Sequence, residues 1–197
     1  MDDSRIVQAP AALAAIASEA EAAGFTMASE PRVGALLAVL AASKPRSRCL
    51  ELGTGTGHAT AWILAGLDAV SRLDTVDTDA AVQAVAKRHL RGDPRVTFHA
   101  VDGAEFIGRA ARGSFDLIYA DAWPGKFSHL DETLSLLRAG GLYVIDDLLP
   151  QPNWAEGHAA RIPPLMAALE GRPGYAALRL AWASGLMIVA RTNGPAG

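Results

Sequence analysis

The stretch "CLELGTGTGHAT", from Cys49 to Thr60, indicates the fold of the whole chain. A short apolar run ends in three glycines at alternate positions, Gly53, Gly55 and Gly57, and a helical pattern follows. Glycine is favoured where the backbone must approach a ligand closely, so the strand–loop–helix pattern predicts a binding loop. Glu51 lies inside the apolar run, where a phosphate-binding loop has no use for a negative charge. The stretch therefore favours a ligand that carries a cationic group and hydroxyls.

Short apolar runs and helical stretches continue to alternate on both sides of this loop. The strand candidates are 48–52, 72–77, 95–101, 115–121 and 141–146, and the helical stretches between them are 58–67, 79–92, 103–113 and 126–140. Short buried runs that alternate with helices indicate βαβ units and a parallel sheet.

The two ends of the chain add other elements. Helices are expected over 10–24 and 30–43, before the first strand, and near 154–171, after the fifth. Only "ASG" separates "YAALRLAW" (175–182) from "LMIVART" (186–192). Parallel neighbours need a long crossover, so this pair must form an antiparallel hairpin. The sequence therefore predicts an α/β fold, a doubly wound and mostly parallel seven-stranded sheet with an antiparallel last strand.

Composition narrows the class of protein. The chain has 197 residues, a net charge of −3 and a single cysteine, Cys49. No apolar run approaches the ~20 residues that a membrane span needs, and no basic block marks a nucleic-acid binder. The polar, acidic start is no secretory signal, so a reducing cytoplasm is expected. We predict one domain over 1–197, with N-terminal helices in 1–45, a ligand-binding core in 46–192 and a frayed tail in 193–197.

Acidic residues follow two further strand candidates. The second ends in "TVDTD", where Asp77 can hydrogen-bond the ribose hydroxyls of a nucleoside and Asp79 is expected to cap the next helix. The third ends in "VDG", which places Asp102 at the same edge of the sheet, within reach of an adenine amino group. Each of these residues alone is more often a helix cap, but together with the glycine loop they favour a nucleoside site.

The segments "LELGTGTG", "TVDTD" and "VDG", with the terminal hairpin, resemble the class I S-adenosyl-L-methionine-dependent methyltransferases over roughly 29–192. The resemblance implies a Rossmann-like sheet, glycines that wrap the methionine and ribose, and a strand carboxylate, Glu51, that supports the loop and the amine-bearing methionine end. The cofactor-binding residues that it implies are Glu51, Gly53, Thr54, Gly55, Gly57, Asp77, Thr78, Asp102, Gly103 and Asp121.

The segments "YADAWPGK" and "GGLYVIDDLL" resemble the cation-dependent O-methyltransferases, the group with the catechol and caffeoyl-CoA enzymes. The resemblance implies a divalent cation, Mg²⁺, held by Asp121, Asp146 and Asp147, with Asp121 and Lys126 as catalytic residues. Asp147 stands where the family has Asn, and Lys126 lies two residues further along than the usual Lys. The implied acceptor is a small hydroxylated, phenolic molecule, and Trp123 and Trp154 are candidates for the wall of its pocket.

The sequence leaves other hypotheses about the function open. A metal-independent small-molecule methyltransferase and a non-catalytic module that binds the cofactor both fit the motifs. A nicotinamide-dependent oxidoreductase is disfavoured by the glycine spacing, by Glu51 and by the hairpin. The N-terminal helices either cover an acceptor pocket or form the face of a homodimer, and composition does not choose between these two.

Overall fold

The computed structural model describes residues 8–192. The predicted frayed tail, 193–197, and the first seven residues lie outside the described residues. The helices within the described part all lack the combination of length and apolar composition that a membrane span requires.

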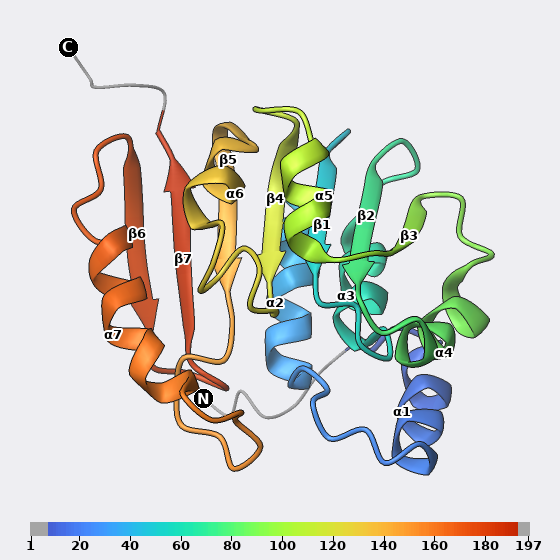
Figure 1. The fold of residues 1–197 in the computed structure, drawn as a ribbon. Coiled ribbons are helices and arrows are strands. Elements are labelled where there is room, and N and C mark those ends of the chain that lie inside the picture. Colours follow the sequence, from blue (N-terminus) through green and yellow to red (C-terminus); the bar gives the residue numbers. More distant parts are fainter. Residues whose placement is uncertain (1–7, 193–197) are drawn as a thin grey trace.

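One sheet organises the described chain (Figure 1). Its strands are β1 (Arg48–Leu52), β2 (Arg72–Asp77), β3 (Val96–Ala100), β4 (Phe115–Ala120), β5 (Leu137–Ile145), β6 (Tyr175–Leu180) and β7 (Leu186–Arg191). They lie in the order β3-β2-β1-β4-β5-β7-β6. Strands β1 to β5 pair in parallel, and β7 is antiparallel to both β5 and β6. The predicted fold class and the antiparallel hairpin are confirmed.

Helices cover both faces of the sheet (Figure 1). They are α1 (Leu13–Ala22), α2 (Pro31–Ala42), α3 (His58–Gly66), α4 (Ala80–Leu90), α5 (Gly103–Arg109), α6 (Leu130–Ser135) and α7 (His158–Leu169). Apolar residues of α1 to α4 form one core cluster with one face of the sheet, and those of α5, α6 and α7 form a second cluster with the other face. Within β1, Cys49 belongs to the first cluster and Leu50 to the second. Both faces of the central strands are buried, which explains their nearly continuous apolar sequence.

The predicted helix over 126–140 is wrong at its C-terminal end. Helix α6 stops at Ser135, and β5 begins at Leu137 instead of at the expected 141. Leu136 and Leu137 are buried in the core, and the backbone N–H of Phe115 donates to the carbonyl of Leu136. The register between β4 and β5 shifts between Phe115 and Leu117 of β4. This irregularity lets residues 137–140 extend the start of β5, although their sequence pattern resembles the end of a helix.

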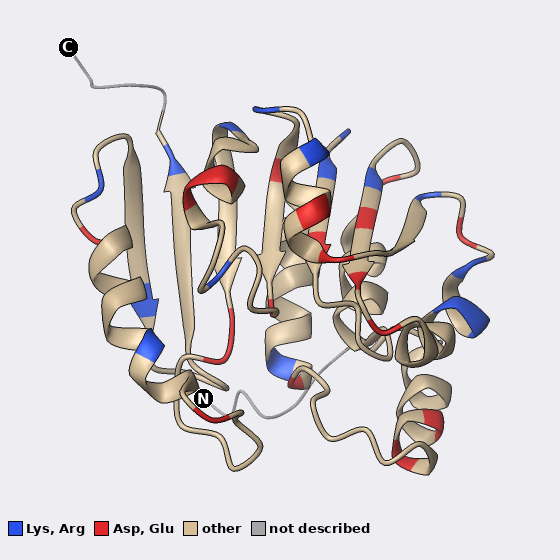
Figure 2. Ribbon diagram, viewed as in Figure 1, with Lys and Arg blue, Asp and Glu red and all other residues tan. Residues whose placement is uncertain are grey.

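The strand order reverses next to β1, because β2 lies on one side of it and β4 on the other. Ligands of open α/β sheets bind at this switch point, beside the carboxyl ends of the strands. Figure 2 shows acidic residues at the lower ends of β2, β4 and β5, which form this edge. The fold thus collects carboxylates where the sequence predicts a site.

Candidate functional site

The loop after β1 has a backbone that glycine suits best. Gly53, Gly55 and Gly57 have φ of 101°, 52° and 96°, a region that L side chains rarely adopt. A Cβ at Gly53 would lie 2.7 Å from the carbonyl oxygen of Asp121, and one at Gly57 would lie 2.7 Å from the Cβ of Ala86. The loop is therefore packed tightly against the start of the β4–α6 connection and against α4.

Glu51 lies beneath this loop and is fully buried. Its Oε2 accepts hydrogen bonds from the hydroxyls of Thr60 at 2.5 Å and Thr75 at 2.6 Å. The Thr75 hydroxyl lies 2.6 Å from that of Thr54, which belongs to the loop. Burial raises the pKa of the Glu51 carboxyl to about 8, although the two hydroxyls oppose this shift. Among the described residues, Glu51 Oε1 has no hydrogen-bond partner.

Asp77 ends β2 and holds the glycine loop from the other side. Its Oδ2 accepts from the backbone N–H of Gly55 at 2.8 Å, and its Oδ1 accepts from that of Asp79 at 2.9 Å. Asp79 caps α4, as predicted, and accepts from the N–H groups of Ala81 and Val82. A carboxylate oxygen has more than one lone pair, so Asp77 keeps acceptor capacity for ribose hydroxyls.

At the end of β3 the acidic residue, Asp102, caps a helix and, unlike Asp77, does not line the cavity. The Asp102 carboxylate caps α5, where it accepts from the N–H of Ala104 at 2.7 Å. Asp102 does not line the neighbouring cavity, whereas Gly103 does. A Cβ at Gly103 would lie 2.9 Å from the Cβ of Pro124, so glycine allows this close packing.

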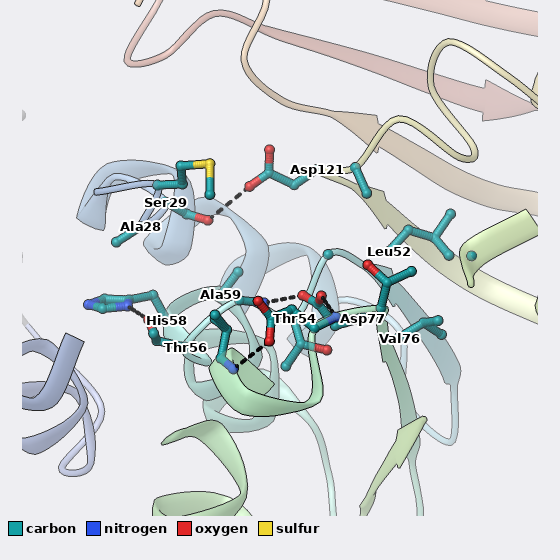
Figure 3. Close-up of a pocket in the computed structure, with 18 of the residues that line it drawn as sticks. Ala28, Ser29, Leu52, Thr54, Thr56, His58, Ala59, Val76, Asp77 and Asp121 are labelled. Carbon is teal, nitrogen blue, oxygen red and sulfur yellow. Dashed lines mark hydrogen bonds between the residues drawn. The ribbon is translucent and has the colours of Figure 1, made fainter. Parts of the chain in front are cut away.

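A first cavity of about 230 Å³ lies over the glycine loop (Figure 3). Of the predicted cofactor residues, Gly53, Thr54, Gly55, Asp77, Thr78, Gly103 and Asp121 line it. Glu51 and Gly57 lie behind this wall, where they support the loop and do not line the cavity. The opposite wall comes from the connection between α1 and α2, through Phe25, Met27, Ala28 and Ser29. The N-terminal segment therefore covers the cavity.

A second cavity of about 290 Å³ adjoins the first. The two cavities share a boundary made of Met27, Ala28, Ser29, Asp121 and Ala122. Most of the remaining wall of the second cavity comes from the loops after β4 and β5 and from the start of α7, among them Trp123, Lys126, Asp146, Asp147, Trp154 and His158. Both candidate wall tryptophans, Trp123 and Trp154, line this second cavity.

Asp121 and Asp146 share one hydroxyl. Tyr119 OH lies 2.5 Å from Asp146 Oδ2 and 3.3 Å from Asp121 Oδ2, and the Ser29 hydroxyl lies 3.3 Å from the same Asp121 oxygen. Asp146 Oδ1 accepts from the hydroxyl of Ser184 and, at 2.6 Å, from the N–H of Asp147. Burial, and then the neighbouring Asp146 carboxylate, raise the pKa of Asp121 well above its usual range. Burial also raises the pKa of Asp146.

Asp147 does not join this pair. Its backbone is left-handed, with φ of 63°, and its Oδ1 accepts from Trp154 Nε1 at 2.6 Å. Its Oδ2 lies 3.5 Å from Nε2 of His158, a nitrogen that also lies 3.1 Å from the Asp147 carbonyl. Within residues 8–192, no group of three His, Cys, Asp or Glu side chains is placed to hold a metal ion. The predicted cluster of Asp121, Asp146 and Asp147 is therefore not assembled, because Asp147 is held by the residues that follow it.

Lys126 reaches the cavity despite its displaced position in the sequence. Its side chain is buried, and its Nζ donates to the carbonyl oxygen of Asp146 at 2.9 Å. The same nitrogen lies 5.1 Å from the centre of the Phe127 ring. The structure thus brings Lys126 beside the carboxyl end of β5 and into the wall shared with Asp121.

Several residues that complete this site were not predicted from the sequence. Tyr119 and Ser184 hold Asp146, Ser29 contacts Asp121, and His158 stacks on Trp154 with ring centres 4.4 Å apart. Tyr119 lies inside an apolar strand and Ser184 inside the hairpin link, so neither carries a local signal. Burial lowers the pKa of His158, which leaves its ring neutral near pH 7.

A glycine loop, an acidic end of β2 and two adjoining cavities at the switch point define a nucleoside-binding α/β protein. Residues 50–148, half of the chain, match the family described as methyltransferase domain, and the chain belongs to this family. A protein of Mycolicibacterium vanbaalenii named "Putative O-methyltransferase" is 35% identical over 120 residues, 58% of this chain and 53% of that protein. The chain spans about half the length of the curated relatives it matches.

Solved structures share the fold over nearly the whole chain. The O-methyltransferase TomG of Streptomyces achromogenes, in complex with S-adenosylmethionine, is 21% identical, with a TM-score of 0.80 over 97% of this chain and 94% of that one. An O-methyltransferase of Bacillus cereus, in complex with S-adenosylhomocysteine, is 19% identical, with a TM-score of 0.79 over 95% and 93%. At these identities the likeness concerns the fold.

Proposed function

We propose that the protein is an S-adenosylmethionine-dependent O-methyltransferase that acts on a small hydroxylated, phenolic molecule. The observation that carries this proposal is the pair of adjoining cavities with Asp121 in their shared wall. The family of the chain and the names of its curated relatives agree with it.

The first cavity fits S-adenosylmethionine. Gly53 and Gly55, both with positive φ, line its floor without side chains, and Asp77 offers a carboxylate beside that floor. The loop and Asp77 would hold the methionine and ribose parts, while Glu51 supports the loop through Thr75 and Thr54. When bound, S-adenosylmethionine supplies a methyl group on a positively charged sulfur, which is the electrophile of the reaction.

The residues of the second cavity would prepare the acceptor. Transfer forms an O–C bond, breaks the C–S bond with its electrons left on sulfur, and releases the proton of the acceptor hydroxyl. Asp121 lines both cavities, so it is placed to accept that proton. Lys126 lies in the same wall and would stabilise the negative charge that develops on the oxygen. Holding the two reactants in line supplies most of the remaining acceleration.

The size and lining of the second cavity favour a small aromatic acceptor. Its volume of about 290 Å³ is at the lower end for ligand pockets, which suits a small molecule. Trp123 and Trp154 provide aromatic surface on its wall. A phenol has a pKa near ~10, so it benefits from a neighbouring base and a cation.

Two measurements test the proposed function. Thermal-shift assays should show that S-adenosylhomocysteine stabilises the protein while NAD does not, because the glycine spacing suits the former. Labelled S-adenosylmethionine incubated with a panel of phenols should yield a methylated product. Stabilisation by NAD alone would reject the cofactor assignment, and binding of S-adenosylhomocysteine without turnover of any hydroxylated acceptor would favour a non-catalytic binding module.

A further inference from the structure

The second cavity holds more carboxylates than cations. Glu30, Asp121, Asp146 and Asp147 line it, and among residues 8–192 only Glu30 of these four has an arginine partner, Arg32 at 3.1 Å. Lys126 is the one Lys or Arg among the described residues in the cavity wall. Asp121 and Asp146, which flank one hydroxyl, need a compensating cation or proton.

Hydrogen bonds within the loop 123–128 fix the position of Lys126. The N–H groups of Lys126, Phe127 and Ser128 all donate to the carbonyl of Trp123, at 3.1, 2.8 and 3.2 Å. The N–H of Gly125, which has φ of 90°, donates to Ser128 at 2.8 Å. The two additional residues before the lysine therefore form a closed turn, and this turn directs the buried side chain back to the end of β5.

Lys126 is a neighbour of both acids, Asp121 and Asp146. All three side chains line the second cavity, and the Lys126 Nζ lies 2.9 Å from the carbonyl oxygen of Asp146. A buried ammonium is expensive unless carboxylates compensate it, and the pair in turn lacks any other buried cation in the described wall. The Lys126 ammonium and the Asp121–Asp146 pair therefore stabilise one another.

We propose that the Lys126 ammonium is the resident cation of the acceptor site, in the place where cation-dependent O-methyltransferases use a divalent ion. Three features carry this inference: Oδ1 of Asp147 is occupied by the Trp154 indole N–H, the hydroxyl of Tyr119 bridges Asp121 and Asp146, and Nζ is fixed on the Asp146 carbonyl. An ammonium has three N–H donors, so two remain beyond that bond for the acceptor oxygen. Its charge also repels a second cation.

The inference has two separable parts. Exclusion of a divalent cation by Lys126 is a property of the protein alone, whereas methyl transfer without a metal rests on the proposed function. Calorimetric titration with Mn²⁺ tests the first part without any substrate. The proteins compared are the wild type, Lys126→Gln and, as control, Lys44→Met. Gln keeps a donor for the Asp146 carbonyl but removes the charge. Lys44 is a half-buried lysine outside the cavity, and its Nζ also donates to a carbonyl, that of Gly140 at 2.8 Å.

We expect Lys126→Gln to bind Mn²⁺ at least about tenfold more tightly than the wild type, because the acid pair loses its only neighbouring ammonium. Lys44→Met should match the wild type. Equal Mn²⁺ affinity in all three proteins would overturn the inference. Lys126→Met, which keeps the aliphatic stem against Phe127, replaces the Gln variant if thermal melting with S-adenosylhomocysteine shows that the latter is unfolded.

The rate of methyl transfer tests the second part. The wild type should turn over equally fast in excess EDTA and in Mg²⁺, and Lys126→Gln should be slower by about 100-fold, the usual effect of removing one charge-stabilising donor. A wild type that loses activity in EDTA and regains it with Mg²⁺ would overturn the inference. Failure to methylate any acceptor would instead reject the proposed function, and the Mn²⁺ titrations would still decide whether Lys126 keeps the metal out.

Discussion

Glu51→Gln isolates the buried carboxyl beneath the glycine loop. Glu51 is fully buried, and burial raises its pKa from 4.5 to about 8. The folded protein therefore keeps this group protonated and neutral up to about pH 8. Gln imitates that neutral form, and the hydroxyls of Thr60 and Thr75 can still donate to its amide oxygen.

Proton linkage gives the sign and size of the contribution that the Glu51 carboxyl makes to the free energy of unfolding. Between pH 4.5 and about 8 the folded protein binds this proton and the unfolded chain does not. The contribution to stability is therefore complete below pH 4.5, falls as the pH rises and is lost above about pH 8. At about 1.4 kcal/mol per pKa unit the whole contribution is about 5 kcal/mol. Between about pH 5.5 and about pH 8.5 the wild type should lose about 3 kcal/mol on this account.

Urea unfolding of the wild type and Glu51→Gln at these two pH values measures the contribution. The difference between their free energies of unfolding should change by about 3 kcal/mol in favour of Gln at the higher pH. Glu21→Gln, at an exposed position of α1, is the control and should show no such change. Parallel pH profiles for the wild type and Glu51→Gln would refute the reasoning, because Glu51 would then be ionised in the folded protein.

Three further substitutions test the site. Asp77→Ala should weaken S-adenosylhomocysteine binding at least about tenfold in calorimetry, because ribose hydroxyls lose a charged acceptor; an unchanged affinity would reject this role. Gly57→Ala should lower the free energy of unfolding by about 1–3 kcal/mol, since its Cβ would lie 2.7 Å from that of Ala86 at a φ of 96°. Tyr119→Phe should cost about 1–3 kcal/mol by leaving Asp146 without its bridging hydroxyl, and a wild-type urea midpoint would contradict that.

Local patterns in the sequence predict the strands of the central sheet well. The candidates at 48–52 and 72–77 coincide with β1 and β2, because both strands are buried on two faces and bounded by turns. The start of β5 could not be predicted, since the bulge that admits residues 137–140 depends on pairing with β4. Pairing between distant strands leaves no mark in a window of a few residues.

In the site, too, local features could be predicted from the sequence, whereas contacts between distant residues could not. The glycine loop and Asp77 are recognisable because their spacing follows directly from a strand end. The contact between Ser29 and Tyr119 joins residues 90 positions apart, and that between Ser184 and Asp146 spans 38. The hydrogen bond that engages the Asp147 carboxylate comes from Trp154, whose position is set by a loop. Such contacts emerge only when the sheet brings these loops to one edge.

The most direct test of the account is a crystal structure of the protein with S-adenosylhomocysteine. We expect the ribose hydroxyls on the Asp77 carboxylate, the methionine part over Gly53 and Gly55, and the sulfur at the boundary of the two cavities beside Asp121. A ligand bound elsewhere, or bound in this cavity with its sulfur pointing away from Asp121, would rule out the proposed function, because methyl transfer into the second cavity would then be impossible.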